Sequence, residues 1–378
     1  MHYFDFHYSW EQRKLGDVVD VRSGKDYKHL SEGNIPVYGT GGFMLSVNQA
    51  LSYDEDAIGI GRKGTIDKPY ILKAPFWTVD TLFYAIPREK VDLNFAFDVF
   101  QNIDWKKKDE STGVPSLSKT AINEIDVLVP QYDEQQPLGQ FFNRIDNLIT
   151  LHQRKYDKLT NVKKSMLEKM FPQNGSNAPE IRFKGFTEAW EQRKFSDLVQ
   201  IERGGSPRPI DDFITDSPDG LNWVKIGDAP AQGNYITKTA EKIKPEGLSK
   251  TREVHPGDLI LSNSMSFGKP YIMGIDGCIH DGWLLIRNTY KVFDLTFLCH
   301  VLGTPQMIIQ YKSLAAGSTV NNLNKELVGN TVVTIPTIKE QRVLGQYLET
   351  LDNLITLHQR ELEKLKNLKK ACLEKMFV

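Results

Sequence analysis

Two long segments of the chain carry apolar residues at gaps of three and four. The first apolar stripe runs through 138–171, and the second repeats it through 344–378. This spacing is typical of an amphipathic α-helix. No proline or glycine interrupts either segment after Gly139 and Gly345, so each is predicted to be one helix about 50 Å long.

A stripe this long and narrow has to be buried against a partner helix, and the other copy is the obvious partner. Pro172 and the polar stretch after it predict the end of the first helix and the start of a linker. We expect the seam between the two helices to be formed by Leu148, Tyr156, Leu159, Leu351, Leu354, Leu362 and Leu365.

The regions outside these helices predict β-rich domains with short helices. Short apolar or alternating runs, such as AIGIG, TLFYAI and GWLLIR, are separated by clusters of Gly, Pro and Asn. An apolar strand closed by proline precedes each long helix, at 125–130 and 331–336. The predicted fold class is α+β, with two mixed α/β, β-rich domains alternating with two long helices.

An internal repeat organises the whole chain. Residues 10–24 return as 190–204 with 8 of 15 positions identical, and 145–171 return as 351–377 with 19 of 27 identical. The first motif recurs at an offset of 180 and the second at 206, so the second middle region is 26 residues longer. The middles are mostly dissimilar, which favours two different binding surfaces on one retained scaffold.

The repeat predicts the domain boundaries. The first head comprises residues 1–137 and the second head residues 190–337, with the long helices at 138–171 and 338–378 and a linker at 172–189. Asp80 and Asp281 occupy matching places in the two heads, so we expect them to hold shared structure rather than to read a ligand.

Composition excludes several classes of protein. No run approaches the roughly 20 apolar residues that span a bilayer, and the first residues show neither the basic nor the apolar part of a signal peptide. The three cysteines are an odd number without a close pair, so we expect no disulfide framework, no zinc site, and a reducing cytoplasm.

No motif of a catalytic or nucleotide-binding site is convincing. Gly59-Ile-Gly-Arg-Lys-Gly64 fits the glycine pattern of dinucleotide-binding loops, but Pro69 follows too soon for a helix to begin there. We interpret it as a Gly-rich turn, or as a loop that brings Arg62 and Lys63 toward phosphate. The ATP-binding loop, the methyltransferase base-holding motif and the zinc-protease motif are all absent from the sequence.

The order of motifs resembles that of type I restriction-modification specificity subunits. Residues 179–199 look like the family's lead-in to a recognition domain, and 222–228, 254–261 and 268–269 are similar to its inner core. Residues 112–119 and 316–325 resemble its exit segment, and Glu134-Gln135 and Glu340-Gln341 mark the start of each long helix. The resemblance covers nearly the whole chain from Trp10, although the first copy lacks the lead-in.

The resemblance implies a non-catalytic DNA-recognition subunit of cytoplasmic bacterial or archaeal origin. The two long helices would pack as an antiparallel coiled coil around a pseudo-two-fold axis, and each head would read one half of a bipartite double-stranded DNA target. Two methyltransferase subunits would dock on the helices, and restriction/translocase subunits would join them. S-adenosylmethionine, ATP and magnesium are expected on those partners, with no cofactor or metal on this chain.

The charge distribution limits how tightly the heads alone can hold DNA. The whole chain has a net charge of −1, the helix segments 138–171 and 344–378 carry +4 and +1, and the remainder therefore carries −6. Affinity from phosphate neutralisation should be modest for the isolated chain. The family's partner subunits would supply much of the grip on the backbone.

Polar and basic residues beside glycines are the best candidates for contact with bases, because the backbone can approach the groove there. In the first head these are Arg22, Ser23, Lys25, Tyr38, Thr40, Arg62, Lys63 and Thr65. In the second head they are Arg203, Ser206, Arg208, Lys225, Ser262, Asn263, Ser266 and Lys269. For each of them, an ordinary solvated loop residue is the competing interpretation.

Three other functions fit parts of the pattern. A recognition module of a fused, type II-like restriction enzyme would differ in its neighbouring genes. A coiled-coil protein whose heads bind other proteins would show no sequence-selective DNA binding even with a methyltransferase present. A free-standing enzyme is disfavoured by the missing motifs.

Overall fold

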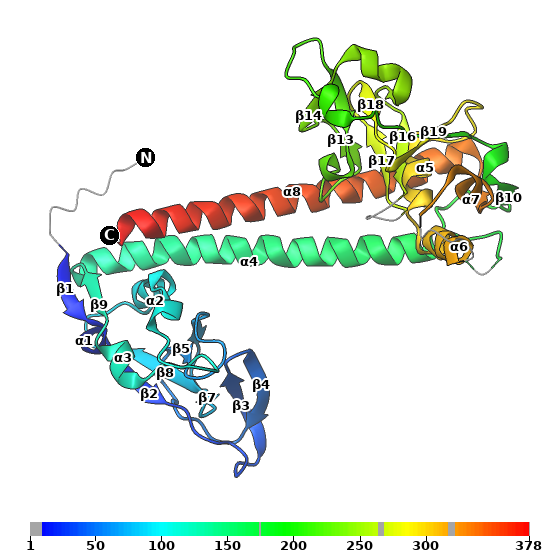
Figure 1. The fold of residues 1–378 in the computed structure, drawn as a ribbon. Helices are drawn as coiled ribbons and strands as arrows, with labels where there is room; N and C mark the ends of the chain where they lie inside the picture. The colour runs from blue at the N-terminus through cyan, green and yellow to red at the C-terminus, as the bar shows by residue number, and fades with distance from the viewer. Residues whose placement is uncertain (1–9, 174, 264–267, 317–321, 378) are drawn as a thin grey trace. The chain divides into compact units, whose positions relative to one another are not determined.

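The structure is a computed structural model that describes residues 10–173, 175–263, 268–316 and 322–377. The chain divides into two compact units (Figure 1). The first unit comprises residues 1–152 and 361–378, and the second comprises 153–360. Each unit contains one head and a part of both long helices. The division into heads, helices and linker at the predicted boundaries stays a prediction.

The first unit is built from short strands and helices that precede the first long helix, α4 (Tyr132–Lys169). In chain order these are β1 (Glu11–Lys14), α1 (Leu15–Val18), β2 (Val19–Ser23), β3 (Glu32–Gly39), β4 (Gly42–Val47), β5 (Ala57–Gly61), β6 (Tyr70–Leu72), β7 (Trp77–Thr78), β8 (Leu82–Pro87), α2 (Leu93–Asn102), η1 (Trp105–Lys108), α3 (Lys119–Asn123) and β9 (Asp126–Val129). The end of the second long helix, α8 (Ile338–Met376), completes the unit.

Two sheets form the body of the first head. An antiparallel sheet has the order β2-β8-β5-β6, and a smaller sheet has the order β4-β3-β7, in which β3 and β7 run parallel. Leu15, Val19, Ile58 and Phe95 are completely buried in the core between the first sheet and α2.

The second unit contains the elements of the second head. In chain order these are β10 (Glu191–Lys194), η2 (Phe195–Asp197), β11 (Gln200–Arg203), η3 (Ile210–Asp212), β12 (Leu221–Val224), η4 (Ile226–Asp228), β13 (Tyr235–Ile236), β14 (Glu241–Ile243), η5 (Pro245–Lys250), β15 (Arg252–Val254), β16 (Leu259–Ser262), β17 (Pro270–Met273), β18 (Gly277–Ile279), β19 (Trp283–Arg287), α5 (Leu295–Leu302), α6 (Pro305–Ala316), α7 (Lys325–Gly329) and β20 (Val332–Ile335).

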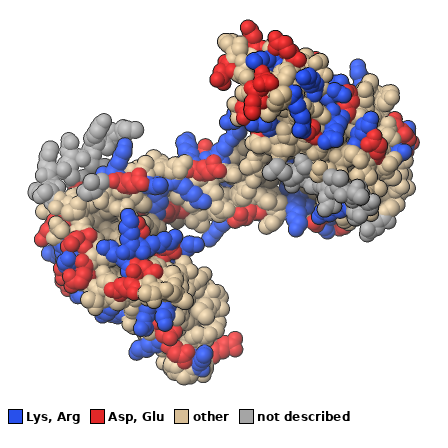
Figure 2. All heavy atoms as spheres, in the orientation of Figure 1, with Lys and Arg blue, Asp and Glu red and all other residues tan. Residues whose placement is uncertain are grey.

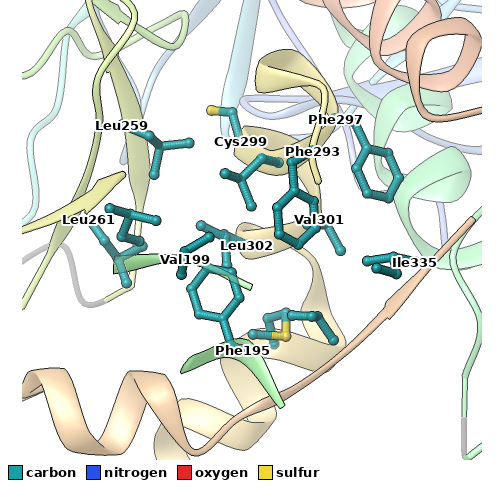
Figure 3. Packing of buried hydrophobic residues seen from close by; sticks show 14 of the residues in the cluster. Phe195, Val199, Leu259, Leu261, Phe293, Phe297, Cys299, Val301, Leu302 and Ile335 are labelled. Carbon is teal, nitrogen blue, oxygen red and sulfur yellow. The ribbon is translucent and has the colours of Figure 1, made fainter. Parts of the chain in front are cut away.

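The second head repeats the plan of the first with additions. Its main sheet has the order β11-β19-β16-β17-β13 and its second sheet the order β14-β12-β18-β15, with β12 and β18 parallel. Strands β13 and β15 have no counterpart among the described residues of the first head, which fits the greater length of the second middle region. Figure 3 shows the packing of Phe195, Leu259, Leu261 and Phe297 in its core.

Each head is closed by a two-stranded ribbon made from the repeated motifs. The WEQRK segment of the first head pairs as β1 with β9, and that of the second head pairs as β10 with β20. Both ribbons are antiparallel, with Glu11 opposite Val129 and Glu191 opposite Ile335. The predicted proline-closed strands are therefore the partners of the repeated Trp motif. The predicted α+β class is confirmed.

Each head is fastened to the start of a long helix by the same hydrogen bonds. The indole Nε1 of Trp10 donates to Glu134 Oε1 at 3.0 Å, and that of Trp190 donates to Glu340 Oε1 at 3.3 Å. The next residues, Gln135 and Gln341, accept from the backbone amides that open α2 and α5, in both cases at 3.0 Å. The repeated Trp and Glu-Gln motifs thus act together to connect each head to its long helix.

The long helices pair in an antiparallel manner within each unit. In the first unit, Phe142 and Ile145 near the start of α4 pack against Leu373 near the end of α8. In the second unit, Leu159 in the later part of α4 packs in the same core as Leu348 near the start of α8. In each unit the apolar stripe of one long helix is therefore buried against the other long helix, as an amphipathic helix requires.

The start of the first long helix and part of the expected seam differ from the prediction. Helix α4 begins at Tyr132, ahead of the predicted start at 138, and Pro137 lies inside it. The expected seam residues Leu148 and Leu354 are 45% and 38% exposed, because the apolar stripe is wider than the buried contact. Of the other expected seam residues, Leu351 and Leu362 are buried, whereas Tyr156, Leu159 and Leu365 are half-buried.

Candidate nucleic-acid interface

In the first head, the loops that carry the candidate residues meet around segment 78–82. The amide of Lys25 donates to Thr78 O at 2.9 Å, and the amide of Val79 donates to Tyr38 O at 3.0 Å. The amide of Arg62 donates to Thr81 O at 2.8 Å. These bonds bring the ends of β2, β3 and β5, which lie far apart in sequence, to one edge of the head.

Exposed polar side chains line this edge. A surface cavity of about 370 Å³ is bordered by Ser23, Arg62 and Lys63, together with part of the exit segment. The Arg62 guanidinium lies 5.7 Å from the centre of the Phe83 ring and 3.4 Å from Asp80 O. The ring and the carbonyl orient the arginine while leaving it exposed.

Other candidates of the first head lie in different surroundings. Arg22 forms ion pairs with Asp20 at 2.7 Å and Glu55 at 3.3 Å, which raise the pKa of its guanidinium. Tyr38 is half-buried, and Thr40 lies in the turn of the β3–β4 hairpin. Arg22 is therefore already neutralised by the protein itself.

The glycine pattern at 59–64 forms the end of a strand and a turn. Residues 57–61 are strand β5, and no helix begins in 62–69. Gly64 has a φ of +90°, a conformation that favours glycine. Thr65 follows it and is half-buried. The predicted Gly-rich turn is confirmed, and the helix N-terminus that a dinucleotide site requires is missing there.

In the second head, Asp281 is the centre of a similar cluster. Ser206 Oγ donates to Asp281 Oδ1 at 2.9 Å, and Arg208 Nη2 lies 3.6 Å from Asp281 Oδ2. Asn263 Nδ2 donates to Asp281 O at 2.8 Å. Asp281 follows strand β18 as Asp80 follows strand β7 in the first head; a shared structural role for the two side chains stays a prediction.

Basic side chains surround this centre. Arg203 ends strand β11 and is exposed. Lys225 follows β12 and forms an ion pair with Glu241, whereas Lys269 Nζ lies 4.9 Å from the centre of the Tyr271 ring. Ser266 lies outside the described residues. The second head thus presents a set of side chains unlike that of the first.

Two candidates of the second head are buried. Ser262 and Asn263 are only 0% and 4% exposed, and Ser262 Oγ accepts a hydrogen bond from the amide of Lys269 at 3.1 Å. Strand β16 is buried along its whole length, so these polar residues are hidden although a glycine lies nearby. This burial disfavours direct contact of the two side chains with bases, and their role stays a prediction.

The structure adds residues that the sequence reasoning did not single out. Leu117 N donates to Arg62 O at 3.0 Å, which places Ser116 and Lys119 of the exit segment beside the first cluster. In the second head, His280 is bonded through its amide to Val224 O at 3.2 Å, next to Lys225. These residues join the loop clusters only because strands far apart in sequence pair with one another. For Ser116 and Lys119, the resemblance of 112–119 to the family's exit segment was the one indication in the sequence.

The surface charge is mixed. On the face drawn in Figure 2, lysines and arginines are interspersed with aspartates and glutamates in both units. Among the described residues, no group of three or more His, Cys, Asp or Glu could hold a metal ion. Within the same described residues, none of the helices is long and apolar enough to cross a membrane.

Together, the fold and its two unlike loop clusters define a duplicated recognition protein. The chain belongs to the family described as type I restriction modification DNA specificity domain, whose model matches residues 8–161 and 187–367. It is therefore a DNA-recognition subunit of a type I restriction-modification system and not its catalytic component.

Individual relatives agree with this assignment. The type I restriction enzyme MjaVIII specificity subunit of Methanocaldococcus jannaschii is 22% identical over 400 residues, covering 96% of this chain and 90% of the relative. The S subunit of a type I system from M. genitalium matches with a TM-score of 0.73 at 12% identity, covering 100% of this chain and 98% of that one. A structure described as type I R-M complex assembly and conformational transition matches with a TM-score of 0.52 at 16% identity, covering 99% and 98%.

Proposed function

We propose that the first head reads one half of a bipartite DNA target through the loops around 78–82, and the second head reads the other half through the loops around Asp281. The observation that carries this proposal is the matched position of the two clusters on a duplicated scaffold. In both heads the same backbone geometry supports the loops, while the exposed side chains differ. Unlike side chains at equivalent places would read unlike bases.

We also propose that methyltransferase subunits dock on the long helices. Leu148 and Leu151 of α4 are 45% and 46% exposed, and their counterparts Leu354 and Leu357 of α8 are 38% and 51% exposed. Exposed apolar residues at matching places on two repeats suit two identical partners. One methyltransferase on each set would give two per chain, with restriction/translocase subunits joining the assembly.

These partners would carry the chemistry and much of the DNA affinity. S-adenosylmethionine would be bound by the methyltransferases, and ATP and magnesium by the partners that need them. The regions outside the segments 138–171 and 344–378 carry a net charge of −6, so the chain alone should bind DNA weakly. Location in the cytoplasm stays a prediction from the cysteine usage.

The experiment is co-expression with the cognate methyltransferase, followed by genome-wide mapping of methylated adenines. We expect one bipartite sequence with an unspecified spacer. The double variant R62A/K63A should relax or abolish one half of that sequence, and R208A/K269A should affect the other half. The variant K107A, an exposed lysine paired with Asp104, serves as the matched charge control.

The result would contradict the proposal if both double variants altered the same half. An unchanged sequence in every variant would contradict the assigned loops. Binding without any sequence preference would favour a protein-binding role for the heads.

A further inference from the structure

The tip of the β3–β4 hairpin in the first head carries two exposed apolar side chains. Phe43 is 63% exposed and Met44 is 49% exposed. Successive residues of a strand point to opposite faces of the sheet, so a tip that exposes both projects beyond the body of the head. Water contact with two large apolar side chains is unfavourable, which favours a binding role for the tip.

The tip is held in place rather than free to fold back. The Tyr38 ring lies edge-on to the Phe43 ring, with 6.3 Å between the ring centres. The Tyr70 ring is tilted relative to the Tyr38 ring, with 6.1 Å between their centres. The hydroxyl of Tyr70 donates to Gly39 O at 2.6 Å. Gly42, with a φ of +103°, permits the turn that presents Phe43. A row of aromatic rings therefore supports Phe43 from behind.

The tip lies at the same edge as the polar cluster. Tyr38 pairs with Phe43 on one side and with Thr78 on the other, and the amide of Lys25 bonds to Thr78. Three steps of about 4.8 Å separate the backbones of Phe43 and Lys25, or about 15 Å. At 3.4 Å per base pair this corresponds to about four base pairs. One short DNA segment can therefore contact both.

We propose that Phe43, with Met44 beside it, inserts between two adjacent base pairs at one end of the half-site that the first head reads. This inference rests on the function proposed above. Apolar side chains that enter a base step unstack it and kink the duplex. Pyrimidine–purine steps are the easiest to deform, so such a step is expected at the insertion point. Phe43 thereby becomes a specificity-determining residue that makes no hydrogen bond to a base.

The proposal predicts that the DNA is kinked in the half-site of the first head and not in that of the second head. In the second head the connection between β12 and β14 spans residues 225–240, all of them described, and its one large apolar residue above 36% exposure is Tyr235. The Tyr235 hydroxyl is already bonded to Glu349 at 2.8 Å. The half-site of the second head should therefore keep its stacking.

The test uses the full-length chain with its methyltransferase and duplexes that carry 2-aminopurine at successive positions of each half-site. The half-sites come from the methylation map. Wild-type protein should raise the fluorescence at one step of the first half-site and at none of the second. F43A should abolish that rise and weaken binding about tenfold, as expected when the apolar side chain that fills the opened base step is lost, whereas F43L should retain most of both.

Controls separate this inference from the function on which it rests. Y290A removes a 66% exposed aromatic from the second head and should change neither fluorescence nor affinity. Phe43 is exposed, so F43A should melt at the wild-type temperature. Wild-type methylation of a bipartite sequence with no fluorescent step would overturn the insertion alone. Failure of F43A to co-purify with the methyltransferase would also overturn it, because the tip would then bind protein.

Discussion

At the scale of single residues, the contact between head and helix depends on two glycines. A side chain at Gly139 would place its Cβ 2.6 Å from both Asp92 Oδ1 and the amide of Phe95. At Gly345 the corresponding distances are 2.9 Å to Asp294 Oδ1 and 2.8 Å to the amide of Phe297. These glycines let the capped N-terminus of α2 or α5 touch the long helix. The repeat retains them because a Cβ has no space there.

The variant G139A should therefore destabilise the first unit. The added methyl group meets backbone and a capping carboxylate, which cannot both move without breaking the cap, so we expect a loss of about 1–3 kcal/mol. Urea unfolding of G139A and of the control G113A would measure it, since a Cβ at Gly113 meets nothing within 4 Å. Equal stability of the two variants would show that α2 can shift away freely.

A second residue-scale feature is a buried carboxyl group at the same junction. Asp98 lies six residues after Asp92, which caps α2, and His300 lies six residues after Asp294, which caps α5. Burial raises the pKa of Asp98 to about 9, Lys369 opposes that shift, and Asp146 adds to it. In the second unit, His300 Nε2 lies 2.9 Å from Asp352. Burial acts to raise the pKa of Asp352, but His300 and Lys163 outweigh it and lower that pKa.

Replacing Asp98 with asparagine should stabilise the protein as the pH rises. An unfolded aspartate ionises near pH 4, so between about pH 4 and pH 9 unfolding releases a proton that the folded chain retains. The stability of the wild type therefore falls with increasing pH through that window, by at most about 1.4 kcal/mol per pH unit. D98N has no such proton, and its advantage should be larger at pH 8 than at pH 5.

Urea unfolding at both pH values measures this difference. D104N is the matched control, because Lys107 lowers the pKa of the exposed Asp104, and it should give no advantage at high pH. A D98N variant that is less stable than wild type at pH 8 would mean that Asp98 is ionised and paired with Lys369.

At the scale of elements, the two long helices are joined by reciprocal ion pairs. Lys369 of α8 contacts both oxygens of Asp146 in α4, at 2.5 and 2.6 Å. Lys163 of α4 pairs with Asp352 of α8. The repeat offset of 206 relates Asp146 to Asp352 and Lys163 to Lys369. Each repeat therefore contributes one acidic and one basic residue. The two ion pairs fix the register of α4 against α8 at two separate places.

Removing one member of a pair should cost more than removing both. Lys369 is only 9% exposed, so K369M leaves Asp146 without its partner in a partly buried site, at a cost of about 3–5 kcal/mol. The double variant D146L/K369M should lose markedly less. A double-mutant cycle by thermal or urea unfolding measures the coupling. K370M, which breaks an exposed pair with Glu374, should change stability by less than about 0.5 kcal/mol, and a similar small effect of K369M would contradict the assigned register.

Much of this architecture could be predicted from sequence because it is periodic or repeated. The helical stripes and the duplication predict the long helices and the paired heads. The loop clusters were only partly predictable, since backbone bonds between distant strands bring Lys25, Arg62 and Lys119 together. Leu148 and Ser262 show the limit: periodicity does not reveal which part of a stripe is covered, and a polar residue beside a glycine can still be buried.

At the scale of the whole molecule, each long helix is continuous and contributes residues to both units. Helix α4 has 38 residues and α8 has 39. At 1.5 Å per residue each is nearly 60 Å long. We propose that this length sets the number of unspecified base pairs between the two half-sites, while the loops set the bases.

Inserting residues in the helices should therefore change the spacer alone. Four residues lengthen a helix by roughly 6 Å, or about two base pairs at 3.4 Å each. The insertion belongs after His152 in α4, with a matching one after Arg360 in α8, because both points lie away from the ion pairs at 146/369 and 163/352. Methylation mapping of the variant should show both half-sites unchanged and a spacer about two base pairs longer. Altered half-site bases with a constant spacer would mean that the helices do not measure the distance, and that the separation is set by the partner subunits instead.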